Sequence, residues 1–169
     1  MIEINTDIAQ KLNEQVTSEA NASNIYLQMS LWCEDRGLEG SAKFFRQHVA
    51  EELDHRDRIV NYMIESGIPV TLSDLPAPKN DYNNLVEVVD AAYKHEVLVT
   101  EEIHTLASMA LDVRDFNTFN MLQWFIAEQR EELMLFRSVQ DFLEKAAFTG
   151  EPGDQLVNVD AYLGSLEHE

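Results

Sequence analysis

Glu52 and His55 lie three positions apart in a stretch whose apolar residues recur at helical spacing. This separation puts both side chains on one face of a helix, where a carboxylate and an imidazole can bind the same cation. Phe45 and Ile59 lie on that face as well, which indicates that the face is buried. Taken alone, the pair is weak evidence for a site, because most helical glutamates are solvated and this spacing often arises by chance.

The same interruption of an apolar stripe occurs in four long stretches of the chain. Steps of three and four residues trace one stripe in each stretch, and polar side chains able to bind a metal lie near its midpoint. In an antiparallel bundle of matched helices, these midpoints fall in one layer of the core. Carboxylates in such a layer repel one another and lose hydration, so they require protons or multivalent cations. The layer predicts a site for two divalent metals, made of Glu19, Glu52, His55, Glu96, Gln129 and Glu132.

The donor atoms of this layer favour particular metals. Hard carboxylate oxygens with one imidazole suit iron or manganese, whereas a structural zinc site would favour cysteine and histidine in a closed tetrahedron. The predicted site therefore favours iron or manganese over structural zinc.

The elements that would position these residues are helices. Six glycines and four prolines divide the chain into four long helical patterns and a short tail, with no alternating strand pattern. Short first and third connections and a long second one predict two antiparallel hairpins joined by a crossover. We therefore expect one all-α domain over residues 1–169, with helices at about 5–36, 41–66, 82–111 and 115–147 and a short C-terminal helix at about 155–166.

The charge of the chain limits its partners. Acidic residues outnumber basic ones by 31 to 12, giving a formal net charge of −19, which repels nucleic acids and anionic membranes and attracts cations. There is no signal-peptide pattern, and no stretch has the roughly 18 apolar residues of a membrane span. The single cysteine, Cys33, excludes an internal disulfide. We expect a soluble, cytoplasmic protein without nucleic-acid or membrane partners.

Several segments make the chain resemble the non-haem bacterial ferritins over nearly its whole length. In order, they are KLNEQV, IYLQMSLWC, EGSAKFFRQHVAEELDH, YKHE and TFNMLQWFIAEQREE. The resemblance implies a ferritin-like four-helix bundle with a di-iron centre. It assigns Glu19, Glu52 and His55 to the first iron, with Glu52 bridging, and Glu96 and Glu132 to the second, with Gln129 beside it.

The resemblance assigns two further roles. Tyr26 matches the tyrosine that lies against the di-iron centre, where it can hydrogen-bond a ligand or supply an electron. Glu51, Glu128 and Glu131 match the acids of a third iron site, although each is also compatible with a solvated helix face.

Leu53 and His48 bear on whether the site includes a haem and on how far it extends along the helix. Bacterioferritins have a haem-binding methionine between the Glu and His of this motif, and here the position is Leu53, so no haem is expected. His48 lies one helical repeat before His55 and either extends the site or is a hydrogen-bonded core histidine.

The resemblance implies a ferroxidase that also stores iron. Fe²⁺ is expected to bind at the paired site and to be oxidised by O₂ or H₂O₂ to Fe³⁺, which is stored as ferric mineral inside a 24-subunit cage. Tyr26, Glu52, His55 and Gln129 are expected to act in the oxidation. A non-storage di-iron oxidase or peroxidase of the same fold is the alternative, and a four-helix interaction module would leave the buried acids unexplained.

Overall fold

The computed structural model describes residues 5–167, and the described chain is all-α, as predicted. Its long helices have the apolar stripes expected from the sequence, and the short last helix follows a glycine-containing turn. The helices are α1 (Thr6–Glu34), α2 (Glu39–Glu65), α3 (Leu85–Asp112), α4 (Phe116–Lys145) and α5 (Asp154–Ser165).

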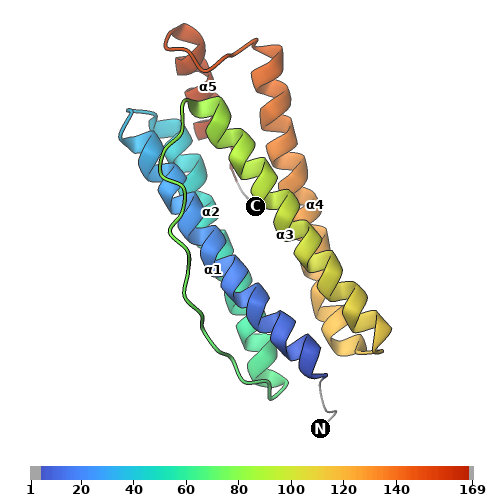
Figure 1. The fold of residues 1–169 in the computed structure, drawn as a ribbon. Coiled ribbons are helices and arrows are strands. Elements are labelled where there is room, and N and C mark those ends of the chain that lie inside the picture. The colour runs from blue at the N-terminus through green and yellow to red at the C-terminus, as the bar shows by residue number, and fades with distance from the viewer. Residues whose placement is uncertain (1–4, 168–169) are drawn as a thin grey trace.

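The topology is two antiparallel hairpins joined by a long crossover, which confirms the prediction (Figure 1). α1 pairs with α2, and α3 pairs with α4. The crossover, residues 66–84, runs along the length of the bundle and returns the chain to the end at which α2 began. This arrangement places the midpoints of the four long helices at one level.

Side-chain caps set where several helices begin. Asn84 accepts a hydrogen bond from the backbone N–H of Glu87 at 3.0 Å, so α3 begins at Leu85, three residues later than expected from the sequence. Asp115 caps α4 through the backbone N–H of Thr118, also at 3.0 Å. Each cap satisfies a backbone donor that the first turn of a helix leaves unpaired.

The core consists of two apolar clusters with polar residues between them. One cluster contains Phe45 and Phe136, and the other contains Leu12 and Phe125. The apolar stripes face this core, as Leu12, Phe45, Val89 and Leu122 show by being buried, while Val49 on the stripe of α2 is half-buried. Within the described chain, no helix is both long and apolar enough to cross a membrane.

α5 packs against the beginning of α2 and supplies the cap that α2 lacks. The carboxylate of Asp160 accepts hydrogen bonds from the backbone N–H groups of Gly40 and Ser41 at 3.1 and 2.7 Å, and from the Ser41 hydroxyl at 2.6 Å. Gly40 permits this approach, because a Cβ there would lie 2.0 Å from the carbonyl oxygen of Asp160. The position of α2 is therefore fixed by a residue 120 positions away in the sequence.

Candidate metal centre

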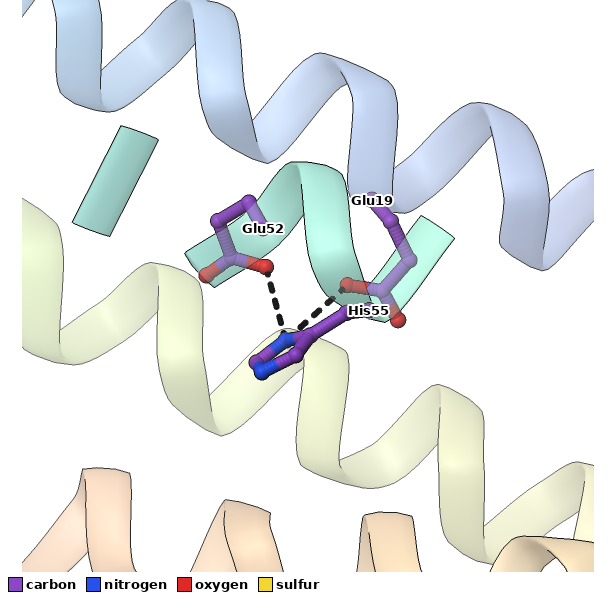
Figure 2. A group of neighbouring side chains, drawn as sticks. All are labelled: Glu19, Glu52 and His55. Carbon is purple, nitrogen blue, oxygen red and sulfur yellow. Dashed lines mark hydrogen bonds and ion pairs between the residues drawn. The ribbon is translucent and has the colours of Figure 1, made fainter. Parts of the chain in front are cut away.

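Glu19, Glu52 and His55 form one compact group in the middle of the bundle (Figure 2). Glu19 comes from α1, and the other two come from successive turns of α2. The Nδ1 atom of His55 lies 3.2 Å from Glu52 Oε2 and 3.8 Å from Glu19 Oε2. All three residues are at most 3% exposed. The structure thus brings together two carboxylates and an imidazole that were predicted to hold one metal.

The carboxylate of Glu19 is held on its other side by Gln15. The amide of Gln15 donates to Glu19 Oε1 at 2.8 Å, and Gln15 is itself buried. Burial raises the pKa of Glu19 well above its usual range, and the nearby charge of Glu52 raises it further. Because burial disfavours its negative charge, the Glu19 carboxylate binds either a proton or a cation.

Glu96 connects α3 to the other side of the layer. The Tyr26 hydroxyl donates to Glu96 Oε1, and the Gln129 amide donates to Glu96 Oε2 at 3.0 Å. Gln129 also donates to Thr100 Oγ1 at 3.3 Å, which orients the amide. Burial raises the pKa of Glu96, with a further increase from Glu132, while the donors from Tyr26 and Gln129 oppose it.

Glu52 occupies the centre of the layer. Burial raises the pKa of its carboxyl well above the usual range, and the negative charges of Glu96 and Glu132 contribute to the increase. Tyr26 is fully buried beside these acids, and burial followed by the charge of Glu96 raises the pKa of its phenol. Tyr26 is therefore a neutral hydrogen-bond donor at ordinary pH, as its contact with Glu96 requires.

A second group able to hold a cation adjoins the first. His48, Glu51 and Glu132 have ligand atoms that all lie within 4.8 Å of one another. His48 Nε2 lies 3.3 Å from Glu132 Oε2. His48 and Glu132 are buried, whereas Glu51 is half-buried, so this group lies nearer to the surface of the bundle.

The other two acids expected at a third site have different surroundings. Glu128 Oε1 lies 3.8 Å from His55 Nε2, with the Glu128 side chain partly exposed. Partial burial raises the pKa of Glu128, and the charges of Glu132, Glu131 and Glu51 contribute while His55 opposes them. Glu131 is exposed. Of the three expected acids, only Glu51 belongs to the compact group with His48 and Glu132.

Two supporting residues, Gln15 and Thr100, were not identified as part of the site from the sequence. Gln15 holds Glu19, and Thr100 holds Gln129. Each lies four positions from a site residue on its own helix, so helical spacing was a usable signal. His48 was identified only as an open alternative, and its location one heptad before His55 was the signal for its position on the same face.

The two groups together contain acids from α1, α2 and α4 and two histidines from α2, and apolar clusters lie on either side of them. Glu96 of α3 adds a further buried carboxylate beside Glu52 and Glu132. Oxygen-rich donors with an imidazole can hold divalent transition metals close together, and bound cations would compensate the buried negative charge. The fold and this site define a ferritin-like four-helix protein with a carboxylate-rich core.

Comparisons with known proteins give a more particular assignment. Residues 9–146 match the family model of the ferritin-like domain. The chain is 40% identical over 163 residues to a probable bacterial non-heme ferritin-like protein of Haemophilus influenzae, covering 96% of this chain and 97% of the relative. It is 36% identical to the bacterial non-heme ferritin of Campylobacter jejuni, with 96% of each covered.

The fold is similarly close to solved ferritin structures. An open-pore ferritin of the archaeon Archaeoglobus fulgidus superposes with a TM-score of 0.92 at 30% identity, covering 99% of this chain and all of that one. The chain belongs to the ferritin family, and within it to the non-haem bacterial type.

Proposed function

We propose that this protein is an iron-storage ferritin and a ferroxidase. Its substrate is Fe²⁺, which two positions in the buried layer bind and from which O₂ or H₂O₂ removes one electron per iron. The Fe³⁺ product leaves the site for storage as a ferric mineral. A 24-subunit cage of identical chains provides the enclosed space, and no haem takes part.

The observation that supports this proposal most strongly is the convergence of Glu19, Glu52 and His55 in a dry layer. Burial disfavours the charged form of both carboxylates, as their raised pKa values indicate. A divalent cation compensates this charge more fully than one proton does, and anionic oxygen donors stabilise Fe³⁺ over Fe²⁺. The same atoms that attract Fe²⁺ therefore favour its oxidation.

The residues have distinct roles in this proposal. Glu19 and His55 hold the first iron, Glu96 and Glu132 hold the second, and Glu52 lies between the two positions. Gln129 orients Glu96 through their 3.0 Å hydrogen bond.

Tyr26 donates a hydrogen bond to the same carboxylate and lies close enough to the centre to supply an electron. We propose Glu51, with Glu128 and Glu131 in the same neighbourhood, for a third iron position.

The test is to replace Glu52 or His55 by alanine. Each change removes a donor from the paired site, so rapid aerobic oxidation of Fe²⁺ should be lost, with a decrease of at least about tenfold in the initial rate. Stopped-flow absorbance of the ferric product measures this rate.

Asp54→Asn is the matched control, because Asp54 is exposed on the same turn of α2. This control should oxidise Fe²⁺ at the normal rate. Normal initial rates in both alanine variants, with their folding verified by circular dichroism, would refute the site assignment.

The alternative is a di-iron oxidase or peroxidase of the same fold that stores nothing. Its chemistry would use the same residues, so the alanine variants do not separate the two functions. The two functions are distinguished by the amount of iron that the protein retains after oxidation. A storage protein keeps many more Fe³⁺ ions per chain than its few ligand positions can hold, whereas an oxidase releases them.

A further inference from the structure

A pocket of about 310 Å³ lies between α1 and α3. Residues of both helices line it, among them Glu14 and Gln15 of α1 and Glu101 and Glu102 of α3. The wall also contains Lys11, which is paired with Glu14 at 2.5 Å. Neither Glu101 nor Glu102 forms an ion pair within the described chain, so the wall of the pocket has a net negative charge.

The polar groups of this pocket become more buried toward the metal centre. Glu101 is exposed, Glu102 is half-buried, and Gln15 is only 4% exposed. Ser18, the residue before Glu19, donates to Glu102 Oε2 at 2.5 Å and holds that carboxylate against α1. The negative charge of the pocket therefore extends from the surface to the neighbourhood of Glu19.

Gln15 contacts both the pocket and the metal centre. Its Nε2 atom donates to Glu19 Oε1 at 2.8 Å, because a carboxylate can only accept. The nitrogen and the oxygen of an amide point in different directions, so the Gln15 oxygen is turned away from Glu19. Among the described residues, no hydrogen bond reaches this buried oxygen. An unpaired buried acceptor in a pocket wall can bind a cation or the water that a cation carries.

The size of the pocket suits a hydrated ion. Six waters at about 30 Å³ each occupy about 180 Å³, which is less than the volume of the pocket. Within the described chain, the acids of the pocket do not form a compact ligand group like that of Glu19, Glu52 and His55. The pocket is therefore suited to an ion that keeps its water shell, held through hydrogen bonds from the bound waters.

A second pocket near the metal centre is less suited to cations. It lies between α2 and α4, and its lining includes Arg58, Glu65 and Trp124. The charges of Arg58 and Glu65 cancel, and the guanidinium carbon of Arg58 lies 3.9 Å from the centre of the Trp124 ring. Of these two pockets, the one between α1 and α3 attracts cations more strongly.

We propose that the pocket between α1 and α3 is an entry site from which divalent cations reach Glu19. A hydrated cation is held there by Glu101, Glu102 and the amide oxygen of Gln15. It then moves past Gln15 and exchanges bound water for the carboxylate of Glu19. Fe²⁺ as the natural cargo rests on the function proposed above.

The rate of Co²⁺ binding without any oxidant tests the entry site. The double substitution of Glu101→Gln and Glu102→Gln should slow binding at least about threefold at low salt, because a charged pocket raises association rates about tenfold or more. The Kd and the amount bound at equilibrium should not change, because an entry site affects entry and exit alike. Stopped-flow absorbance of bound Co²⁺ measures the rate, and a titration measures the equilibrium.

The control is the double substitution of Glu144→Gln and Glu151→Gln. It removes the same charge from exposed positions at the end of α4 and just after it. This control should bind Co²⁺ at the normal rate. Equal slowing of both double variants would reveal a general charge effect and overturn the proposal. A normal rate in the pocket variant would also overturn it, as would a smaller amount of bound Co²⁺.

Hexaamminecobalt(III) tests whether the pocket holds a hydrated ion. This complex donates hydrogen bonds as a hydrated cation does, but it does not exchange its ammonia ligands for protein atoms. Crystals soaked in it should show an anomalous cobalt peak in the pocket and none at Glu19 and His55. The peak should disappear in the Glu101→Gln and Glu102→Gln variant. Absence of the peak from the unmodified protein, or its persistence in that variant, would refute the site.

Both experiments are independent of the proposed ferroxidase activity, because neither cobalt species is oxidised in them. Slow Co²⁺ entry in the pocket variant, with no Fe²⁺ oxidation by the unmodified protein, would contradict the proposed function alone. Rapid Fe²⁺ oxidation by the unmodified protein, with normal Co²⁺ entry in the pocket variant, would contradict the entry site alone.

Discussion

Glu19 is held by neighbours on two sides of its carboxylate. Gln15 donates to one oxygen at 2.8 Å, and His55 lies 3.8 Å from the other. These contacts orient the Glu19 carboxylate. Burial and the charge of Glu52 nevertheless raise the pKa of Glu19. A residue of this kind favours cation binding and, without a cation, makes the stability of the fold depend on pH.

Replacing Glu19 by glutamine should weaken that pH dependence. In the apoprotein the folded state has the higher pKa, so above the ordinary value of 4.5 it binds more protons than the unfolded chain. The free energy of unfolding should therefore fall as pH rises from 4.5 through the raised pKa, and Glu19→Gln should flatten this fall. Urea unfolding in the presence of a chelator, measured at several pH values, gives the two profiles.

The control for this comparison is Glu101→Gln, at an exposed position of α3. It should reproduce the profile of the unmodified protein. Parallel profiles for Glu19→Gln and the unmodified protein would show that Glu19 is not the origin of the dependence.

At the scale of elements, α2 supplies more of the candidate metal ligands than any other helix. It contains His48, Glu52 and His55, which are buried in the core, and the half-buried Glu51 beside Glu52. Its first turn has no cap from its own N-terminal residues and depends on Asp160 of α5. α5 is thus a support for the helix that bears most of the candidate ligands.

Replacing Asp160 by alanine should destabilise the protein. The change removes the cap of α2, for which a loss of about 1 kcal/mol is typical, and it removes the polar contact that holds α5. Chemical denaturation measures the free energy, and limited proteolysis before Asp154 reports release of α5. Glu151→Ala, in the exposed connection before α5, is the control, and equal stability of the two variants would refute the capping role.

At the scale of the whole molecule, the negative charge attracts cations, and the exposed apolar residues are compatible with the proposed contacts between identical chains. The chain has a formal net charge of −19, which concentrates cations near it. Large apolar side chains are exposed on α4, α5 and the crossover, including Phe116 at 64%, Val157 at 68% and Leu72 at 76%. Contacts between identical chains would remove such residues from water.

Size-exclusion chromatography with light scattering tests the proposed cage. The expected particle has a mass near that of 24 chains of 19.4 kDa each. A monomer or dimer would contradict storage and favour the oxidase alternative. Iron loading followed by the same separation should show the ferric mineral eluting with the particle.

The sequence by itself determined the all-helical class, the two hairpins and the six residues of the central layer. It did so because buried positions recur every three to four residues along a helix, so a charged residue at such a position can be recognised from the sequence alone. The tertiary structure decided which donors group together. Only packed helices show that His48 Nε2 faces Glu132, that Glu131 remains exposed, and that Asp160 caps a helix far away in the sequence. Those contacts depend on side-chain directions between helices, which spacing along one helix does not specify.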